Sequence, residues 1–124
     1  MSIETRQQLK EFNDYQQEQA LLAKYPVDDI YMAMAYTCLG LVGEAGEVSE
    51  KVKKAIRKQN LAELLRDEES VAEIAKELGD VLWYVSAVAN EIGYTLEEIA
   101  NINIAKLTDR VNRNVLVNGS GDNR

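Results

Sequence analysis

The 124-residue sequence contains no histidine, and this absence excludes several common catalytic chemistries. Ser-His-Asp triads, most zinc sites and histidine-based proton transfer all require an imidazole. The one cysteine, Cys38, has no partner for an internal disulfide, and we expect it to be a small buried hydrophobe. Any chemistry must therefore come from carboxylates, lysine, arginine or a bound metal ion.

Long apolar runs and an excess of basic residues are also missing. No stretch approaches the roughly 20 apolar residues that cross a bilayer, and the first residues, MSIETRQQLKEFNDYQQEQ, lack the apolar segment of a signal peptide. The net charge of −7 and the pI near 4.6 disfavour a nucleic-acid polymer as partner, because its binders neutralise phosphates with clustered Lys and Arg. We therefore expect a cytoplasmic protein that binds neither a membrane nor a polynucleotide.

Proline is almost absent, and apolar residues recur at helical intervals. The one proline, Pro26, predicts the end of a first helix over residues 4–23. Asp28 or Asp29 can cap a second helix over residues 30–58, in which apolar residues repeat every three or four positions. The polar stretch QNLAELLRDEES that follows has room for a short helical turn.

Two further helices, over residues 70–92 and 95–111, are expected after this connection. Each begins with a Ser or Thr followed three places later by Glu, which is the spacing of a capping box. These pairs are Ser70 with Glu73 and Thr95 with Glu98. Gly93 should end the earlier of the two helices, because glycine readily adopts the left-handed conformation that follows a helix.

Four helices with short connections predict an all-α protein, a four-helix bundle. We expect residues 1–112 to form a single domain and residues 113–124 to be a flexible tail. Apolar residues surround the third helix, including Leu82, Trp83 and Val85, and one small chain cannot easily bury them all. We therefore expect a homo-oligomer that completes the bundle.

Two pairs of carboxylates interrupt the apolar stripes of the second and third helices. Glu44 and Glu47 lie one turn apart on one helix, and Glu77 and Asp80 lie one turn apart on the other. Four such groups repel one another at a packed surface unless a cation lies between them. Oxygen ligands without histidine or thiolate match Mg²⁺ or Mn²⁺. One pair alone is usually a solvated helix face, whereas two registered pairs favour a metal site.

Glycines flank both acidic pairs. Gly40, Gly43 and Gly46 recur at three-residue intervals in the second helix, and Gly79 lies inside the second acidic pair. Each glycine in a helix interior costs about 1 kcal/mol relative to alanine. The sequence therefore predicts that a neighbouring helix or a ligand approaches closely at these positions.

Two segments, GLVGEAGEVSEKVKKAIRK and IAKELGDVLWYVSAVANEIGYTLEEIANINIAKLTDR, carry a family resemblance. Over most of residues 30–110 the chain resembles the MazG-type nucleoside triphosphate pyrophosphohydrolases of the all-α NTP pyrophosphatase superfamily. The resemblance implies Mg²⁺ ligation by Glu44, Glu47, Glu77 and Asp80, and hydrolysis of NTPs, with dNTPs expected, to the monophosphate and pyrophosphate. It also points to a homodimer or homotetramer.

Substrate contacts are expected from the last helix and from one aromatic residue. The family's Asn-x-x-Lys-Leu-x-x-Arg run stands here as Asn103, Lys106, Leu107 and Arg110. Its basic members suit phosphate oxygens, although such pairs are also ordinary on solvated faces. Tyr84, which follows the second acidic pair, can stack on a base or belong to the core.

Three basic residues of the second helix, Lys51, Lys54 and Arg57, could serve the same purpose as the run on the last helix. Exposed basic residues are common on helices that contact no ligand. The favoured interpretation for these three is therefore a solvated face.

The implied ligand set suggests a mechanism. Mg²⁺ would bridge phosphate oxygens, neutralise charge in an in-line displacement and lower the pKa of a bound water. Glu47 is the candidate to act instead as the general base that orients this water. Between Glu47 and Glu77 lie 29 residues, at the long end of the family's usual spacing, and we expect the extra length in the LLRDEES connection.

Two other functions fit the same pattern. A non-catalytic helical interaction or regulatory module would keep the bundle without turnover, and it predicts no stabilisation by metal. A dedicated pyrimidine- or histidine-pathway pyrophosphatase would keep the chemistry, and it predicts turnover restricted to one nucleotide.

Overall fold

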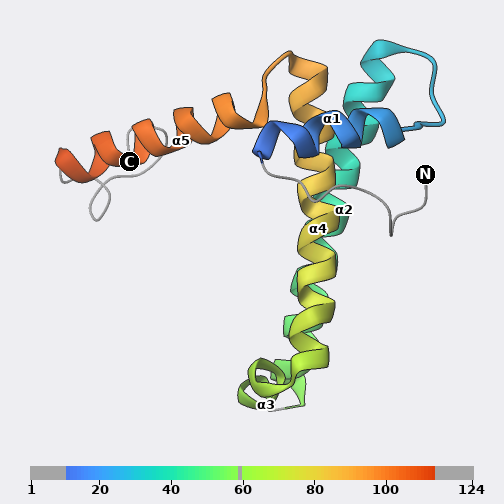
Figure 1. The fold of residues 1–124 in the computed structure, drawn as a ribbon. Helices are drawn as coiled ribbons and strands as arrows, with labels where there is room; N and C mark the ends of the chain where they lie inside the picture. Colours follow the sequence, from blue (N-terminus) through green and yellow to red (C-terminus); the bar gives the residue numbers. More distant parts are fainter. Residues whose placement is uncertain (1–10, 59, 114–124) are drawn as a thin grey trace.

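A computed structural model describes residues 11–58 and 60–113 (Figure 1). These residues form five helices: α1 (Phe12–Leu22), α2 (Ile30–Arg57), α3 (Leu61–Arg66), α4 (Glu68–Ile92) and α5 (Leu96–Asn112). No strand occurs in these two ranges, so the predicted all-α class is confirmed. The predicted flexible tail falls outside the described residues except for Arg113.

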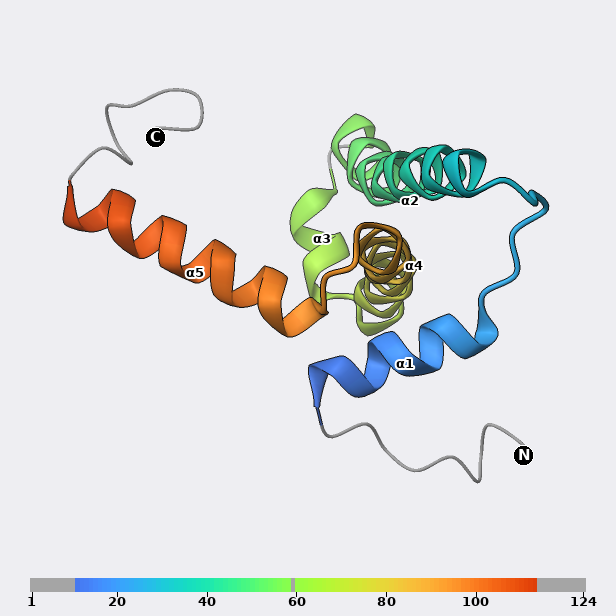
Figure 2. The ribbon, with the colours of Figure 1, turned by 90° about the horizontal axis from the view of Figure 1, so that it is seen from above.

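The long helices α2 and α4 form an antiparallel pair that is closed at one end by the short helix α3 (Figure 1). Seen from above, α4 lies between α2 and α1, and α5 extends away from all three (Figure 2). The main packed surface therefore lies between α2 and α4. No helix of the described part of the chain is both long and apolar enough to span a membrane.

Most of the predicted helix ends are confirmed. Asp29 caps α2 by accepting hydrogen bonds from the backbone N–H groups of residues 31 and 32. Thr95 and Glu98 form the reciprocal capping box of α5. Gly93 ends α4 in the left-handed conformation, with φ 78°. These local signals act within one turn, which is why sequence spacing was sufficient to find them.

Two predicted helix starts were wrong. Asp67, not Ser70, is the N-cap of α4, and its carboxylate accepts hydrogen bonds from the Ser70 N–H and hydroxyl groups. The carboxylate is a strong acceptor at a helix N-terminus, so it starts the helix three residues earlier than the serine would. The first helix cannot run through from residue 4, because Glu11 has an extended backbone with φ −127° and ψ 151°.

A buried glutamine holds α1 against the α4–α5 junction. Gln16 is 7% exposed. Its amide N–H₂ group donates to Asn90 Oδ1 and to the carbonyl of Tyr94, each at 2.8 Å, and its Oε1 accepts from the N–H of Leu96 at 2.9 Å. Gln16 therefore forms hydrogen bonds with backbone groups where α4 ends and α5 begins.

A second buried glutamine completes this polar contact. Gln19, 1% exposed, accepts hydrogen bonds from Ser86 at 3.3 Å and from Asn90 at 2.9 Å, and it donates to Tyr25 at 3.2 Å. Among the residues of α1, the apolar Phe12 and Leu22 are exposed, whereas both glutamines are buried. A polar network rather than an apolar stripe therefore fixes α1.

We expect Gln16→Met to lower the free energy of unfolding by about 2–3 kcal/mol, because it leaves the buried Leu96 N–H group and the Tyr94 carbonyl unpaired. Urea unfolding followed by circular dichroism measures this change. Gln17→Met, at the exposed neighbouring position, is the matched control and should change stability by less than about 0.5 kcal/mol. Equal effects of the two substitutions would contradict the role assigned to Gln16.

The glycine prediction is confirmed at one position. A Cβ atom at Gly40 would overlap the aromatic ring of Tyr84, so α2 and α4 approach closely there. At Gly43, Gly46 and Gly79 a Cβ would meet nothing within 4 Å. The close approach is therefore local to Gly40.

Not every apolar residue of α4 on the helical spacing is buried. Leu78, four residues before Leu82, is 52% exposed.

Candidate metal centre

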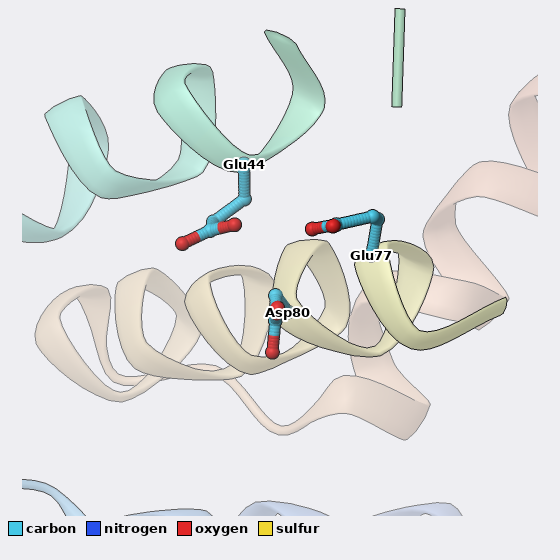
Figure 3. Close-up of side chains that lie close together, drawn as sticks. All are labelled: Glu44, Glu77 and Asp80. Carbon is cyan, nitrogen blue, oxygen red and sulfur yellow. The ribbon is translucent and has the colours of Figure 1, made fainter. Parts of the chain in front are cut away.

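Three of the four predicted carboxylates converge between α2 and α4. Glu44 extends from α2 toward α4, where Glu77 and Asp80 lie one turn apart (Figure 3). One carboxylate oxygen from each lies within 4.8 Å of the other two. Glu44 and Glu77 are half-buried and Asp80 is exposed, so the cluster lies at the edge of the helix pair and remains open to solvent.

Glu47 does not belong to this cluster. It is exposed on α2, one turn after Glu44. Its negative charge nevertheless contributes to raising the pKa of Glu44. Glu47 therefore lies near the cluster without sharing its centre.

The cluster concentrates negative charge on three neighbouring carboxylates. Partial burial is the main cause that raises the pKa of Glu44, and the carboxylates of Asp80 and Glu77 raise it further. A hard divalent cation would relieve this repulsion, and three carboxylate oxygens on two rigid helices are ligands of the kind that Mg²⁺ and Mn²⁺ prefer. The residues present therefore fit a divalent metal ion.

One lysine partly neutralises the cluster. The ammonium group of Lys51 lies 3.5 Å from Glu77 Oε1 and 4.0 Å from Glu73 Oε2. Its side chain is 33% exposed and that of Glu77 is 19% exposed, so solvent screens the pair only in part. This contact corrects the interpretation of Lys51 as part of a solvated face. Its position seven residues after Glu44, which places it on the same helix face, was the signal for this contact.

The raised pKa of Glu44 predicts how stability depends on pH. Its ordinary pKa is 4.5, and the folded state binds the proton more readily than the unfolded state does. The resulting stabilisation is present below the ordinary pKa and is lost as pH rises through the folded-state pKa. In EDTA, the free energy of unfolding of the wild type should therefore fall relative to that of Glu44→Gln as pH rises from the ordinary pKa through the folded-state pKa. Adding Mg²⁺ should restore the lost stability. Thermal unfolding at a series of pH values tests this. A difference in melting temperature between the two proteins that stays constant with pH would contradict this prediction.

Tyr84 lies beside the cluster and packs against Gly40 of α2. Partial burial is the main cause that raises its pKa, with smaller contributions from Tyr36 and Glu44. The ring therefore belongs to the contact between the two long helices, and its hydroxyl lies near Tyr36.

The predicted substrate residues of α5 lie apart from the cluster within one chain. Asn103 and Lys106 are exposed, whereas Arg110 is only 9% exposed. Asp80 precedes the end of α4 at Ile92 by 12 residues, or about 18 Å of helix, and α5 then extends away from the helix pair (Figure 1). The described chain therefore brings the carboxylates together, but it does not bring the α5 residues to them.

The sequence matches the family model of the MazG nucleotide pyrophosphohydrolase domain over residues 34–115. This match covers α2 from residue 34 onward together with α3, α4 and α5, and it includes all three residues of the cluster. The chain belongs to the MazG family.

The gene 37 protein of Mycobacterium phage L5 is 41% identical to this MazG family member over 96 residues, which cover 77% of this chain and 81% of the phage protein. No solved structure matches the present chain significantly.

Proposed function

We propose that the protein is a Mg²⁺-dependent nucleoside triphosphate pyrophosphohydrolase that converts an NTP or dNTP to the monophosphate and pyrophosphate. The observation that carries this proposal is the convergence of Glu44, Glu77 and Asp80 within a MazG domain. Bound Mg²⁺ would neutralise phosphate charge and lower the pKa of water at the reacting phosphorus.

The residues around the cluster divide the remaining tasks. Glu44, Glu77 and Asp80 would hold the ion, which would orient the triphosphate. Glu47, close to the cluster but outside it, accepts a hydrogen bond from the attacking water and takes its proton. Because the three ligands come from two packed helices, the site is organised before substrate arrives.

Pyrophosphate release from a panel of NTPs and dNTPs, measured with Mg²⁺, Mn²⁺ or EDTA, tests this proposal. Release that requires the metal supports it, and the best nucleotide identifies the substrate. If folded protein releases no pyrophosphate from any nucleotide and shows no stabilisation by Mg²⁺, a non-catalytic helical module is the better explanation.

We further propose that the active form is a homo-oligomer. Tyr31, Leu39 and Val42 lie on one side of α2, away from Glu44, and are 82%, 72% and 70% exposed. Exposed apolar side chains grouped in this way favour association with another chain. A second copy could also bring its α5 to the carboxylates, since α5 of the same chain extends away from α2 and α4 (Figure 2).

Mixing two inactive variants tests whether α5 acts in the other chain. We expect Glu77→Gln and Lys106→Ala each to lose activity, and a re-equilibrated equal mixture to recover about a quarter of the wild-type rate. This value follows for a two-fold symmetric dimer, because half the dimers are mixed and each has one intact site. Light scattering measures the oligomeric state. A mixture no more active than its components would show that Lys106 acts within its own chain or not at all.

A further inference from the structure

A polar cavity of about 380 Å³ lies beside the carboxylate cluster, toward the α3 end of the helix pair. Its basic residues, Lys51, Lys54 and Lys58, all come from α2 or its C-cap. Apart from Ala55 and Leu64, all of its lining side chains are polar or charged. A nucleobase site normally offers apolar or aromatic walls. The lining therefore suits an anion better than a base.

The lysines continue the helix face that carries the carboxylates. Glu44, Glu47, Lys51, Lys54 and Lys58 follow one another at intervals of three or four residues, so they form one stripe along α2. Acidic residues occupy the first part of this stripe and basic residues occupy the rest. A ligand lying along α2 would thus pass directly from the metal ligands to the lysines.

Lys51 contacts both the carboxylate cluster and the cavity. Its ammonium group lies 3.5 Å from Glu77 of the cluster, while its side chain also lines the cavity. The cavity and the cluster are therefore immediate neighbours, with Lys51 between them. A polyphosphate whose first phosphate is held at the cluster would meet this ammonium group next.

The remaining charges of the cavity leave it favourable to an anion. Lys54 makes only a loose pair with Glu50 at 3.8 Å, and Lys58 has no ion pair within the described ranges. Of the two acidic lining residues, Asp67 caps α4, and the hydrogen bonds it accepts from Ser70 lower its pKa. Glu63 is the other. Among the lining residues, three lysines therefore stand against one carboxylate, Glu63, that is not engaged in capping.

We propose that this cavity is the pyrophosphate subsite, in which Lys51, Lys54 and Lys58 bind the β- and γ-phosphates and hold the leaving group. This inference rests on the proposed function. In the reaction, a water oxygen forms a bond to the α-phosphorus, and the bond from that phosphorus to the α,β-bridging oxygen breaks. Pyrophosphate leaves with the electron pair, and the water proton passes to the general base. The lysines stabilise the negative charge that develops on the departing oxygens.

Titration calorimetry with inorganic pyrophosphate and Mg²⁺ tests the subsite without requiring turnover. The test variant is Lys54→Ala/Lys58→Ala, for which we expect at least tenfold weaker binding. The matched control is Lys53→Ala/Arg57→Ala, which removes the same charge from the same part of α2 at positions that do not line the cavity. We expect the control to bind within twofold of the wild type. Circular dichroism checks that both variants are folded.

Steady-state kinetics separates this inference from the proposed function. If the wild type hydrolyses nucleotides, the test variant should show a raised inhibition constant for pyrophosphate, which the control should not show. Equal pyrophosphate binding by the two double variants would overturn the subsite and leave the hydrolase proposal intact. Selective loss of pyrophosphate binding in the test variant would support the subsite even if no nucleotide were hydrolysed. Lys58→Glu provides a second variant, which should weaken binding more than Lys53→Glu.

Discussion

Glu77→Gln is expected to lower the rate of pyrophosphate release by about 10³-fold or more, equivalent to about 4 kcal/mol of transition-state stabilisation. Glu77 lies at the centre of the candidate site: it shares the cluster with Glu44 and Asp80, and it also pairs with Lys51 at 3.5 Å. The amide keeps the size of the side chain but removes the charge that would hold a divalent cation. Mg²⁺ binding, measured by calorimetry, should weaken in parallel with activity.

The fold should survive this substitution. The amide loses the partly exposed pair with Lys51, which is worth about 1 kcal/mol or less, but it also relieves repulsion from Glu44 and Asp80. In EDTA, the free energy of unfolding should therefore change by less than about 1 kcal/mol. The rise in melting temperature that we expect Mg²⁺ to give the wild type should be absent from the variant.

Glu73→Gln is the matched control for Glu77→Gln. Glu73 lies one turn earlier on α4, and it pairs with Lys76 at 3.0 Å rather than contributing to the cluster. Activity should remain within about threefold of the wild type, since an exposed ion pair contributes little. If both variants lost activity equally, a general effect of charge on α4 would replace the metal-site explanation.

Gly40→Ala is expected to destabilise the protein by about 1–3 kcal/mol, although alanine normally favours a helix. The new Cβ atom would overlap the Tyr84 ring, so the ring or α4 would have to move. Displacement of Tyr84 would also disturb Glu44, which lies close enough to influence its pKa. We therefore expect activity to fall together with stability.

Gly43→Ala provides the control within the same helix. A Cβ atom at this position meets nothing within 4 Å, so alanine should stabilise α2 by about 0.5–1 kcal/mol. Differential scanning calorimetry should thus show melting temperatures that shift in opposite directions for the two substitutions. Equal shifts would contradict the assignment of the close helix approach to Gly40. Destabilisation by Gly43→Ala would instead indicate that another chain packs against this face.

Several features of the fold were predictable because they depend on neighbours along the chain. The caps at Asp29 and Thr95 and the terminator at Gly93 each act within a single turn, so residue type and spacing predict them. The wrong prediction of Ser70 as the N-cap of α4 also arose from interactions within a single turn. Two acceptors competed for one helix N-terminus, and the spacing of the capping box did not reveal that Asp67 was the stronger.

The candidate site was partly predictable from helical periodicity. Spacing placed Glu44 and Glu77 on the inner faces of their helices, but the register between α2 and α4 decides which carboxylates meet. Register depends on side chains far apart in sequence, such as Gly40 and Tyr84. For this reason helical spacing alone could not show that Glu47 lies outside the cluster formed by the other three carboxylates.

By itself, the sequence determined the all-helical class, the absence of histidine chemistry, the acidic pairs and the family. Composition and short-range spacing carry this information. Only the tertiary structure decided that three carboxylates converge, that Lys51 reaches Glu77, and that α1 is held by buried glutamines. It also decided that α5 extends away from the pair of helices α2 and α4, which carries the cluster (Figure 2). These contacts join residues on different helices, and the packing of the helices, which no single helix specifies, sets their distances.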